Sequence, residues 1–293
     1  MKPATLILAI FALSAAVSLD CIPGTATASR HSSSRRQPIR FGSFNIQIFG
    51  RKKARDAFVM NNLARILNRY DILVVMEIRD KSGEAFRKLV ERANRDERRD
   101  PFSYVISVRT GRTVSKEQYA VLYRESVAEV LSERTVADSG DRFQREPYEV
   151  RLALRPAGRC SSSTTVLTVV CLHTEPDASV EELNALHDML RPRRRENLLI
   201  AGDLNADCRY VNRGEMAALP LRLDPDFLWL IGDGVDTTVK STDCAYDRLI
   251  VTHSAYQLMP GARVFRFDTE FGLSTDQAAQ ISDHYPVELE ILL

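Results

Sequence analysis

The amino-acid sequence predicts an α/β protein in which sheets are covered by helices. After Ile39, short apolar runs alternate with segments whose apolar residues have helical spacing, and the apolar runs end at polar side chains. Near-continuous apolar strands are typical of sheets that are buried on both faces, so helices must pack against them. The chain has 293 residues, 44% of them hydrophobic and 27% charged, which is enough to bury one large core or two modest ones.

Four apolar runs are predicted strands, and each leads to polar residues: "IRFGSFNI" to Asn45, "DILVVMEIRD" to Glu77, "TTVLTVVCLH" to His173, and "NLLIAGDLNAD" to Asp203 and Asn205. Apolar residues three and four positions apart predict amphipathic helices between them. The helical faces are Val59, Leu63, Ile66, Leu67 and Tyr70, then Phe86, Leu89, Val90 and Ala93, and then Leu183, Leu186 and Leu190. No linker or fixed-period repeat divides the chain, so residues 39–293 are predicted to be one domain.

The first 28 residues have the features of a secretory signal peptide. Lys2 precedes an apolar run at residues 6–19, and residues 26–28 form a small-x-small cleavage site. An uncleaved membrane anchor is the alternative, but the run is shorter than the roughly 20 residues that a span needs. We therefore expect a secreted protein that passes through the endoplasmic reticulum lumen. Residues 29–38 are expected to form a basic, flexible segment before the domain.

Charge and cysteine content place only weak limits on the function. The formal net charge of +1 gives no general attraction to polyanions. Without residues 1–28, the remaining cysteines are Cys160, Cys171, Cys208 and Cys244. An even number favours disulfides in an oxidising compartment, although the sequence does not fix the pairs. No Cys-x-x-Cys spacing of the zinc-binding type is present.

The polar residues at the predicted strand ends are candidates for one site, because strand ends at one sheet edge gather side chains into a single cleft. The candidates are Asn45, Glu77, His173, Asp203, Asn205, Asp247 and His284. Taken singly, Asp203 and Asn205 could form a turn, Glu77 a surface ion pair, and His173 an ordinary strand-end histidine. Their recurrence at successive strand ends favours a shared site.

Two histidines among carboxylates and amides indicate acid–base chemistry assisted by a hard cation. Carboxylate and amide oxygens suit Mg²⁺ or Ca²⁺ better than zinc, and such a cation polarises a phosphoryl group. Each histidine needs a carboxylate that fixes its tautomer and stabilises the imidazolium. Adjacent Asp283 and His284, at the start of the last predicted strand, would place a metal-side carboxylate beside a proton-transfer imidazole. The pattern predicts a phosphate-ester hydrolase.

Eight segments, in this order, resemble the deoxyribonuclease I family: "FNIQIFG", "VMEIRD", "KEQYAVLYR", "FQREP", "LHTEP", "GDLNADC", "STDCAYDRLIV" and "SDHYPVE". "GDLN" and "SDH" alone are typical of a wider superfamily of metal-dependent phosphodiesterases and phosphatases, whereas "KEQY", "FQREP" and "CAYDR" narrow the resemblance. "VMEIRD" and "KEQYAVLYR" resemble the gamma-like branch more than the pancreatic enzyme. The resemblance covers residues 39–293 and implies a four-layer α/β sandwich of two packed mixed sheets flanked by helices.

The resemblance implies a secreted, monomeric endonuclease that cleaves DNA with little sequence specificity and leaves 5′-phosphate and 3′-hydroxyl ends. It implies that His173 pairs with Glu117 and His284 with Asp247, as acid and base. The implied Mg²⁺ or phosphate-side groups are Asn45, Glu77, Asp203, Asn205 and Asp283. The alternatives are another phosphodiesterase on the same scaffold, such as a sphingomyelinase, and a relative that binds DNA or actin without turnover.

The resemblance also implies further sites. The implied DNA contacts are Arg79, Arg112, Arg145 and Tyr246. Implied structural Ca²⁺ ligands are Asp236, Thr238 and Thr242 at one site and Asp141, Phe143 and Glu146 at a second, where simple loop polarity is the alternative. Cys208 and Cys244 match the disulfide of the family, whereas Cys160 and Cys171 match no family bridge.

Some positions depart from the pattern of the family. Ser115 stands where the pancreatic enzyme has a tyrosine in the minor groove, so the affinity for duplex DNA is expected to differ. Tyr148 and Ile106 alter the actin-binding patch of the family, and tight inhibition by actin is not expected.

Overall fold

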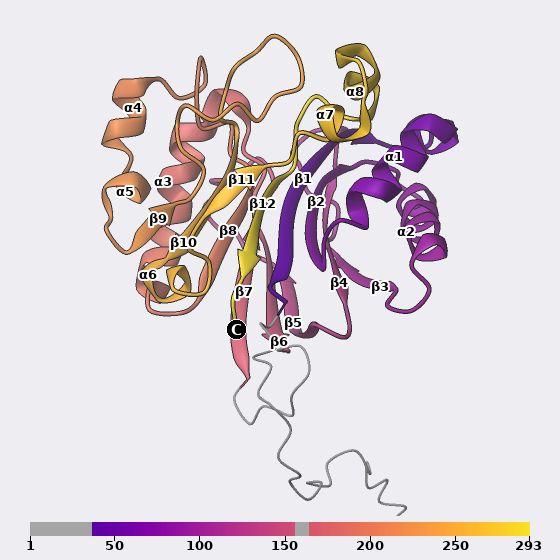
Figure 1. The fold of residues 1–293 in the computed structure, drawn as a ribbon. Helices are drawn as coiled ribbons and strands as arrows, with labels where there is room; N and C mark the ends of the chain where they lie inside the picture. The colour runs from indigo at the N-terminus through magenta and orange to yellow at the C-terminus, as the bar shows by residue number, and fades with distance from the viewer. Residues whose placement is uncertain (1–36, 156–163) are drawn as a thin grey trace, which may run out of the picture. The chain divides into compact units, whose positions relative to one another are not determined.

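The computed structural model describes residues 37–155 and 164–293 (Figure 1). The predicted signal peptide, nearly all of the basic segment and Cys160 lie outside the described residues. The described residues form two six-stranded sheets, in the orders β11-β12-β1-β2-β4-β3 and β5-β6-β7-β8-β10-β9. Within the described ranges, no helix is long and apolar enough to cross a membrane.

The first sheet joins the two ends of the domain. Its central strand β1 (Ile39–Phe49) pairs antiparallel with β12 (Val287–Ile291) and parallel with β2 (Ile72–Ile78). The sheet is completed by β4 (Gln118–Arg124), β3 (Phe102–Ile106) and β11 (Ala262–Val264). Because β1 and β12 are neighbours, residues from the first and last strands reach the same sheet edge.

The second sheet is also mixed. It contains β5 (Ala128–Thr135), β6 (Tyr148–Leu154), β7 (Thr165–Cys171), β8 (Leu198–Asp203), β10 (Asp247–Thr252) and β9 (Phe227–Trp229). β7 and β8 are parallel, whereas β8 and β10 are antiparallel with Asp203 opposite Asp247. This register places two carboxylates side by side at one end of the sheet.

Helices lie on the outer faces of both sheets (Figure 1). Those packed with the first sheet are α1 (Ala57–Leu67), α2 (Glu84–Asp96), α7 (Phe267–Phe271) and α8 (Thr275–Ile281). Those packed with the second are α3 (Ser179–Leu190), α4 (Arg213–Ala218) and α5 (Pro220–Leu223). The short helix α6 (His253–Tyr256) follows β10, and the 3-10 turns are η1 (Lys53–Arg55), η2 (Pro176–Ala178) and η3 (Arg191–Arg193).

Apolar side chains fill three layers of core. In β2, Ile72, Val74 and Met76 belong to the cluster between the sheets, whereas Leu73 and Val75 pack with α1 and α2. A third cluster joins α3, α4 and α5 to the other sheet. Strands buried on both faces are what the near-continuous apolar runs predict. The predicted four-layer α/β sandwich is therefore confirmed.

The first predicted helical face is slightly too long. α1 ends at Leu67, so Tyr70 lies beyond the helix, although it is buried with only 1% of its surface exposed. Its ring lies over Gly42 of β1, where an added Cβ would come within 2.7 Å of the ring. Tyr70 therefore packs as part of the turn that leads into β2.

Candidate active site

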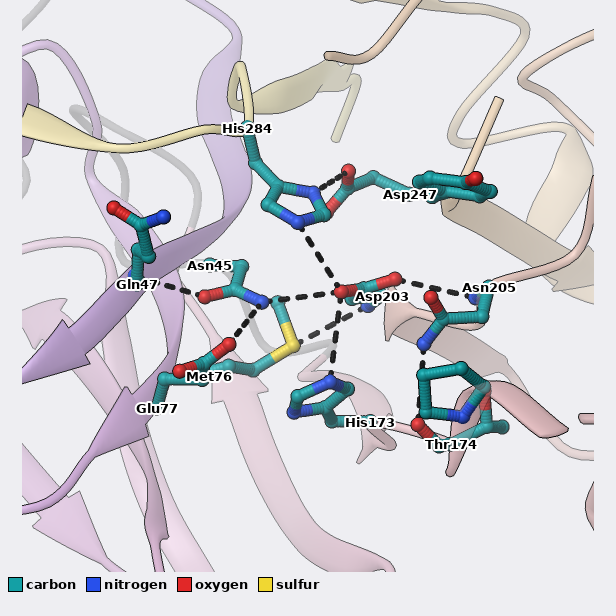
Figure 2. A network of polar contacts seen from close by, with 12 residues as sticks. Asn45, Gln47, Met76, Glu77, His173, Thr174, Asp203, Asn205, Asp247 and His284 are labelled. Atoms are coloured by element: carbon teal, nitrogen blue, oxygen red, sulfur yellow. Dashed lines mark hydrogen bonds and ion pairs between the residues drawn. The ribbon is translucent and has the colours of Figure 1, made fainter. Parts of the chain in front are cut away.

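Asp203, the last residue of β8, lies at the centre of a buried polar network (Figure 2). Its Oδ2 is 3.5 Å from Nε2 of His173 and 3.5 Å from Nε2 of His284. The same oxygen accepts a hydrogen bond of 3.1 Å from Nδ2 of Asn45. Three segments far apart in the sequence thus meet at one carboxylate.

Each imidazole is held on its other nitrogen by a second carboxylate. Nδ1 of His173 lies 2.6 Å from Oε1 of Glu117, and Nδ1 of His284 lies 2.7 Å from Oδ2 of Asp247. With Nδ1 engaged in this way, each Nε2 is directed toward Asp203. Two histidine–carboxylate pairs therefore face each other across one site, which is an arrangement suited to paired proton transfer.

The carboxylates change the proton affinity of both histidines. Burial by itself lowers the pKa of His173, but Glu117 and Asp203 outweigh it, and the pKa is raised above the ordinary value. Burial is outweighed more strongly at His284, where Asp247, Asp203 and Asp283 raise the pKa well above that value. Burial raises the pKa of Asp203, yet the two histidines bring it below the ordinary value.

The His173 pair is embedded among further polar groups. Nε of Arg145 lies 2.8 Å from Oε1 of Glu117, and Nη2 of Arg79 lies 3.4 Å from Oε2. Nη1 of Arg145 also donates to the carbonyls of His173 and Thr174, both at 3.3 Å. Arg145, which the sequence predicts as a DNA contact, is only 9% exposed, and its guanidinium binds the interior of the site.

The predicted metal-side residues lie together, but Asn45 and Asn205 direct their amide nitrogens at neighbouring oxygen atoms. Nδ2 of Asn45 donates to Oε1 of Glu77 and to Oδ2 of Asp203, both at 3.1 Å. Its Oδ1 accepts from the backbone N–H of Gln47 at 2.9 Å, which fixes the orientation of the amide. Asn45 therefore bridges two carboxylates through its nitrogen. Asn205 donates through Nδ2 to the carbonyl of Thr174 at 3.1 Å.

Some of the groups at the site could hold a divalent cation. Asp203, Asp247 and His284 each offer a ligand atom, and these atoms lie within 4.8 Å of one another. Asp203 is the one member of this group that is also among the five predicted metal-side residues. Asp283 adds a buried Oδ1 that accepts no hydrogen bond in the described part of the chain and lies 3.8 Å from Nε2 of His284. Carboxylate oxygens without protein donors are the groups that Mg²⁺ and Ca²⁺ bind.

The backbone is strained where it delivers these side chains. Glu77, Gln47, Ile48 and Asn205 have positive φ values of 60°, 44°, 47° and 46°. Such values are uncommon for residues other than glycine and persist where the surroundings enforce them. The pairing of β1 with β2 shifts register in this region, and the N–H of Ile48 donates to Oε2 of Glu77 at 2.7 Å. The irregular strand end thus aims Glu77 into the site.

The other predicted DNA contacts lie at different places. Arg79 is partly buried between Glu77 and Glu117. Arg112 is exposed, and its Nε lies 3.0 Å from Oδ1 of Asp141, a predicted Ca²⁺ ligand. The ring of Tyr246 lies beside His284, with 6.5 Å between ring centroids. Arg112 and Asp141, predicted for two different sites, therefore contact each other.

The residues of the two predicted Ca²⁺ loops are arranged differently. Oδ1 of Asp236 accepts from the N–H of Thr238 at 2.8 Å. The single hydroxyl proton of Thr238 is shared between Oδ1 of Asp236, also at 2.8 Å, and the carbonyl of Thr242. This loop borders the site, because Thr238 and His284 form a β-bridge. At the second loop, Phe143 is buried, Glu146 is partly buried and Asp141 is exposed.

Cys208 and Cys244 form a disulfide with 5.9 Å between their Cα atoms. The bridge ties the segment after Asn205 to the segment before Asp247, so it lies on the His284 side of the site. Cys171 is a free, buried cysteine in β7.

Three residues of the site lie outside the sequence-based set. The hydroxyl of Tyr119 accepts from the backbone N–H of His173 at 3.0 Å. The hydroxyl of Ser282 donates to the carbonyl of Asn45 at 2.6 Å and accepts from the N–H of His284 at 3.1 Å. Tyr119 belongs to "KEQY" and Ser282 to "SDH", and the resemblance of these segments to the family could have identified both residues. The third residue is Lys53, whose Nζ donates to the carbonyls of Ile46 and Ile281. It lies in a run of basic residues and carries no such signal.

Comparison with known proteins shows which families the sequence matches. The Endonuclease/Exonuclease/phosphatase family matches residues 42–284. Deoxyribonuclease-1 of Bos taurus is 37% identical over 269 residues, which cover 86% of this chain and 92% of the relative. Deoxyribonuclease gamma of Homo sapiens is 38% identical over 268 residues, with 86% of each chain covered. These near-equal identities do not separate the gamma-like branch from the pancreatic one, so the finer placement stays a prediction.

Solved structures share the fold. An endonuclease/exonuclease/phosphatase from Bacteroides vulgatus superposes with a TM-score of 0.59 at 14% identity, covering 88% of this chain and all of the other.

Proposed function

Because the chain belongs to the deoxyribonuclease I family, within the Endonuclease/Exonuclease/phosphatase family, we propose that it is a secreted, divalent-metal-dependent endonuclease of DNA. One observation carries the proposal: Nε2 atoms of two carboxylate-held histidines converge on Asp203 from opposite sides (Figure 2). The reaction is hydrolysis of a phosphodiester bond, with little sequence preference, to a 5′-phosphate and a 3′-hydroxyl. Residues 39–293 form the catalytic domain after removal of residues 1–28.

The two histidines divide the proton transfers. One Nε2 accepts a proton from the attacking water, and the other donates a proton to the leaving 3′ oxygen. Glu117 and Asp247 bind the Nδ1 atoms, so each ring keeps its orientation and its imidazolium form is stabilised. Because both Nε2 atoms lie 3.5 Å from the same oxygen of Asp203, the donor and the acceptor can reach one phosphate.

The metal-side carboxylates have a separate role. Glu77, Asp203 and Asp283, with the amide of Asn205, would hold Mg²⁺, while Asn45 fixes the spacing of Glu77 and Asp203 through its two hydrogen bonds. A bound divalent cation polarises the phosphoryl oxygen and neutralises charge that develops during the reaction. The Asp236–Thr238–Thr242 loop is proposed as a structural Ca²⁺ site, because its oxygens already converge beside His284.

DNA binding is proposed to rely on backbone contacts around this site. Arg79 and Tyr246 border the catalytic groups, and Arg145 contributes by holding Glu117 and the His173 loop. Arg112 is paired with Asp141, and its proposed contact with phosphate requires it to leave this partner. Binding of Ca²⁺ by Asp141 would release Arg112 toward DNA, so these two proposals are linked.

The test is cleavage of supercoiled plasmid with Mg²⁺, with and without Ca²⁺, and with a chelator. We expect metal-dependent nicking, and its loss in Glu77→Gln and His284→Ala. Matched controls are Glu91→Gln on the exposed face of α2 and His253→Ala, an exposed histidine, which should keep full activity. Undiminished nicking by either site variant, or cleavage of sphingomyelin in place of plasmid, would contradict the proposal.

A further inference from the structure

Lys53, in the turn after β1, has a side chain that reaches back into the fold. Its Nζ donates to the carbonyl of Ile46 at 3.0 Å, to the carbonyl of Ile281 at 2.9 Å and to Oε1 of Gln47 at 3.4 Å. The neighbouring Arg51, Lys52 and Arg55 are exposed, whereas Lys53 is partly buried. Within this basic run, Lys53 is the residue whose charge is directed inward.

The two carbonyls belong to segments that carry opposite sides of the site. Ile46 follows Asn45 in β1, and Ile281 is the last residue of α8, directly before Ser282, Asp283 and His284. They are joined a second time by the hydroxyl of Ser282, which donates to the carbonyl of Asn45. The Lys53 contact spans 228 positions of sequence, so it cannot arise from local structure.

The charge of Lys53 also has partners in the site. Burial lowers its pKa to about 8, while the negative charges of Asp283 and Glu77 act in the opposite direction. A partly desolvated ammonium group is unfavourable unless it is hydrogen-bonded and faces negative charge. Both conditions are met only in the folded arrangement of β1 and the loop after α8.

We propose that Lys53 is a positioning residue of the DNA-cleaving site, whose ammonium group holds the end of β1 against the loop that bears Asp283 and His284. This inference rests on the proposed function for its effect on catalysis. Lys53 does not act on the reacting atoms. It fixes the distance between the Asn45–Glu77 side and the Asp283–His284 side, and it leaves the His173 pair, which is anchored by Glu117, Arg145 and Tyr119, unaffected.

The effect on catalysis separates positioning from binding. In Lys53→Met, kcat should fall about 10- to 100-fold, as is typical when a group that orients a site is removed. The KM for plasmid should stay within about threefold, because substrate contacts are kept. Lys53→Arg keeps a charged donor and should recover most of the activity. Lys52→Met, an exposed neighbour of the same type, should behave as the unmodified protein.

A second readout does not depend on turnover. The protein has five histidines, so their ring signals can be assigned by NMR in the metal-free protein. In Lys53→Met the signal of His284 should shift and broaden, while those of His173 and His187 stay in place. Lys53→Arg should restore the His284 signal.

The two readouts separate the possible failures. An unchanged His284 signal together with kcat within about twofold of the unmodified protein would overturn the proposal. Failure of both Lys53→Met and Lys53→Gln to fold would also overturn it, because Lys53 would then be needed for the fold and not for positioning. If the unmodified protein cleaves no DNA but the His284 signal responds as expected, the proposed function fails and the positioning role stands.

Discussion

The two histidine–carboxylate pairs have nearly the same geometry and different surroundings. Glu117 pairs with His173 and is shared with two arginines, Arg145 at 2.8 Å and Arg79 at 3.4 Å. Asp247 pairs with His284 and, within residues 37–155 and 164–293, forms no ion pair with an arginine or lysine. The positive charge that offsets the carboxylate therefore comes from three groups in one pair and from the imidazole alone in the other.

Two hydrogen bonds of nearly equal length can therefore lie in different electrostatic environments. Burial raises the pKa of Glu117, but His173, Arg145 and Arg79 bring it below the ordinary value. Burial raises the pKa of Asp247 to about 6, in spite of its bond to His284. Neutralising Glu117 should therefore reduce both stability and activity, whereas neutralising Asp247 should reduce mainly activity.

The largest expected effect comes from neutralising each carboxylate in turn. Glu117→Gln and Asp247→Asn should each lower kcat by about 100-fold or more, because the imidazole loses the group that orients it. Glu117→Gln should also reduce the free energy of unfolding by about 3–5 kcal/mol, since it removes the nearest carboxylate of both Arg145 and Arg79. Asp247→Asn should leave the thermal midpoint at about pH 8 unchanged or higher, because it removes a costly buried charge.

Single-turnover plasmid nicking and thermal denaturation, measured on both variants, check this asymmetry. Equal losses of stability in the two variants would show that the arginines do not distinguish the pairs.

The disulfide should affect the stability of the protein without distinguishing the catalytic steps. Cys208 and Cys244 are 36 positions apart, and opening this loop should lower the free energy of unfolding by about 4 kcal/mol in the chain-entropy model. In Cys208→Ser/Cys244→Ser, kcat should remain within about threefold at low temperature, since no catalytic contact is removed. Denaturant unfolding measures the first quantity. A selective loss of kcat with unchanged stability would instead assign the bridge to positioning of Asp247.

Glu182 of α3 lies on the His173 side of the site, and its contribution to the stability of the protein should depend on pH. Its Oε1 accepts from the N–H groups of Gln144 and Glu175, and burial raises its pKa to about 7. A carboxyl group with a raised folded-state pKa stabilises the protein below its unfolded pKa, and this stabilisation is lost as the pH rises toward the folded value. Glu182→Gln should thus increase stability by up to about 3 kcal/mol near pH 8.

The difference between Glu182→Gln and the unmodified protein should vanish near pH 4.5, the ordinary value for glutamate. Thermal denaturation across this pH range measures it. A constant difference at every pH would assign the effect to packing and not to the charge of Glu182.

The smallest expected effect concerns Tyr119. Tyr119→Phe leaves the N–H of His173 without its acceptor and should lower the free energy of unfolding by about 1–3 kcal/mol. The kcat should fall less than tenfold, because Glu117 still orients the ring. A loss of kcat as large as that of Glu117→Gln would show that the backbone, and not the carboxylate, sets the position of His173.

Much of the fold could be predicted from sequence, and so could the set of polar residues that meet around Asp203. The apolar runs ending at Glu77 and Asp203 identified buried strands, and their polar ends meet as expected from sheet topology. Sequence patterns report which residue ends a strand, but not which of its atoms faces a neighbour. The inward amide nitrogen of Asn45, the contact of Arg112 with Asp141 and the inward charge of Lys53 all depend on long-range packing.

The central claim is that both histidine pairs act on one phosphate. Its most direct test is single-turnover plasmid cleavage by His173→Ala, His284→Ala and the double variant. If the histidines act as a unit, the double variant should be about as slow as the slower single variant, because either loss already disables the concerted transfer. Losses that simply multiply in the double variant would show two independent contributions and would contradict the account.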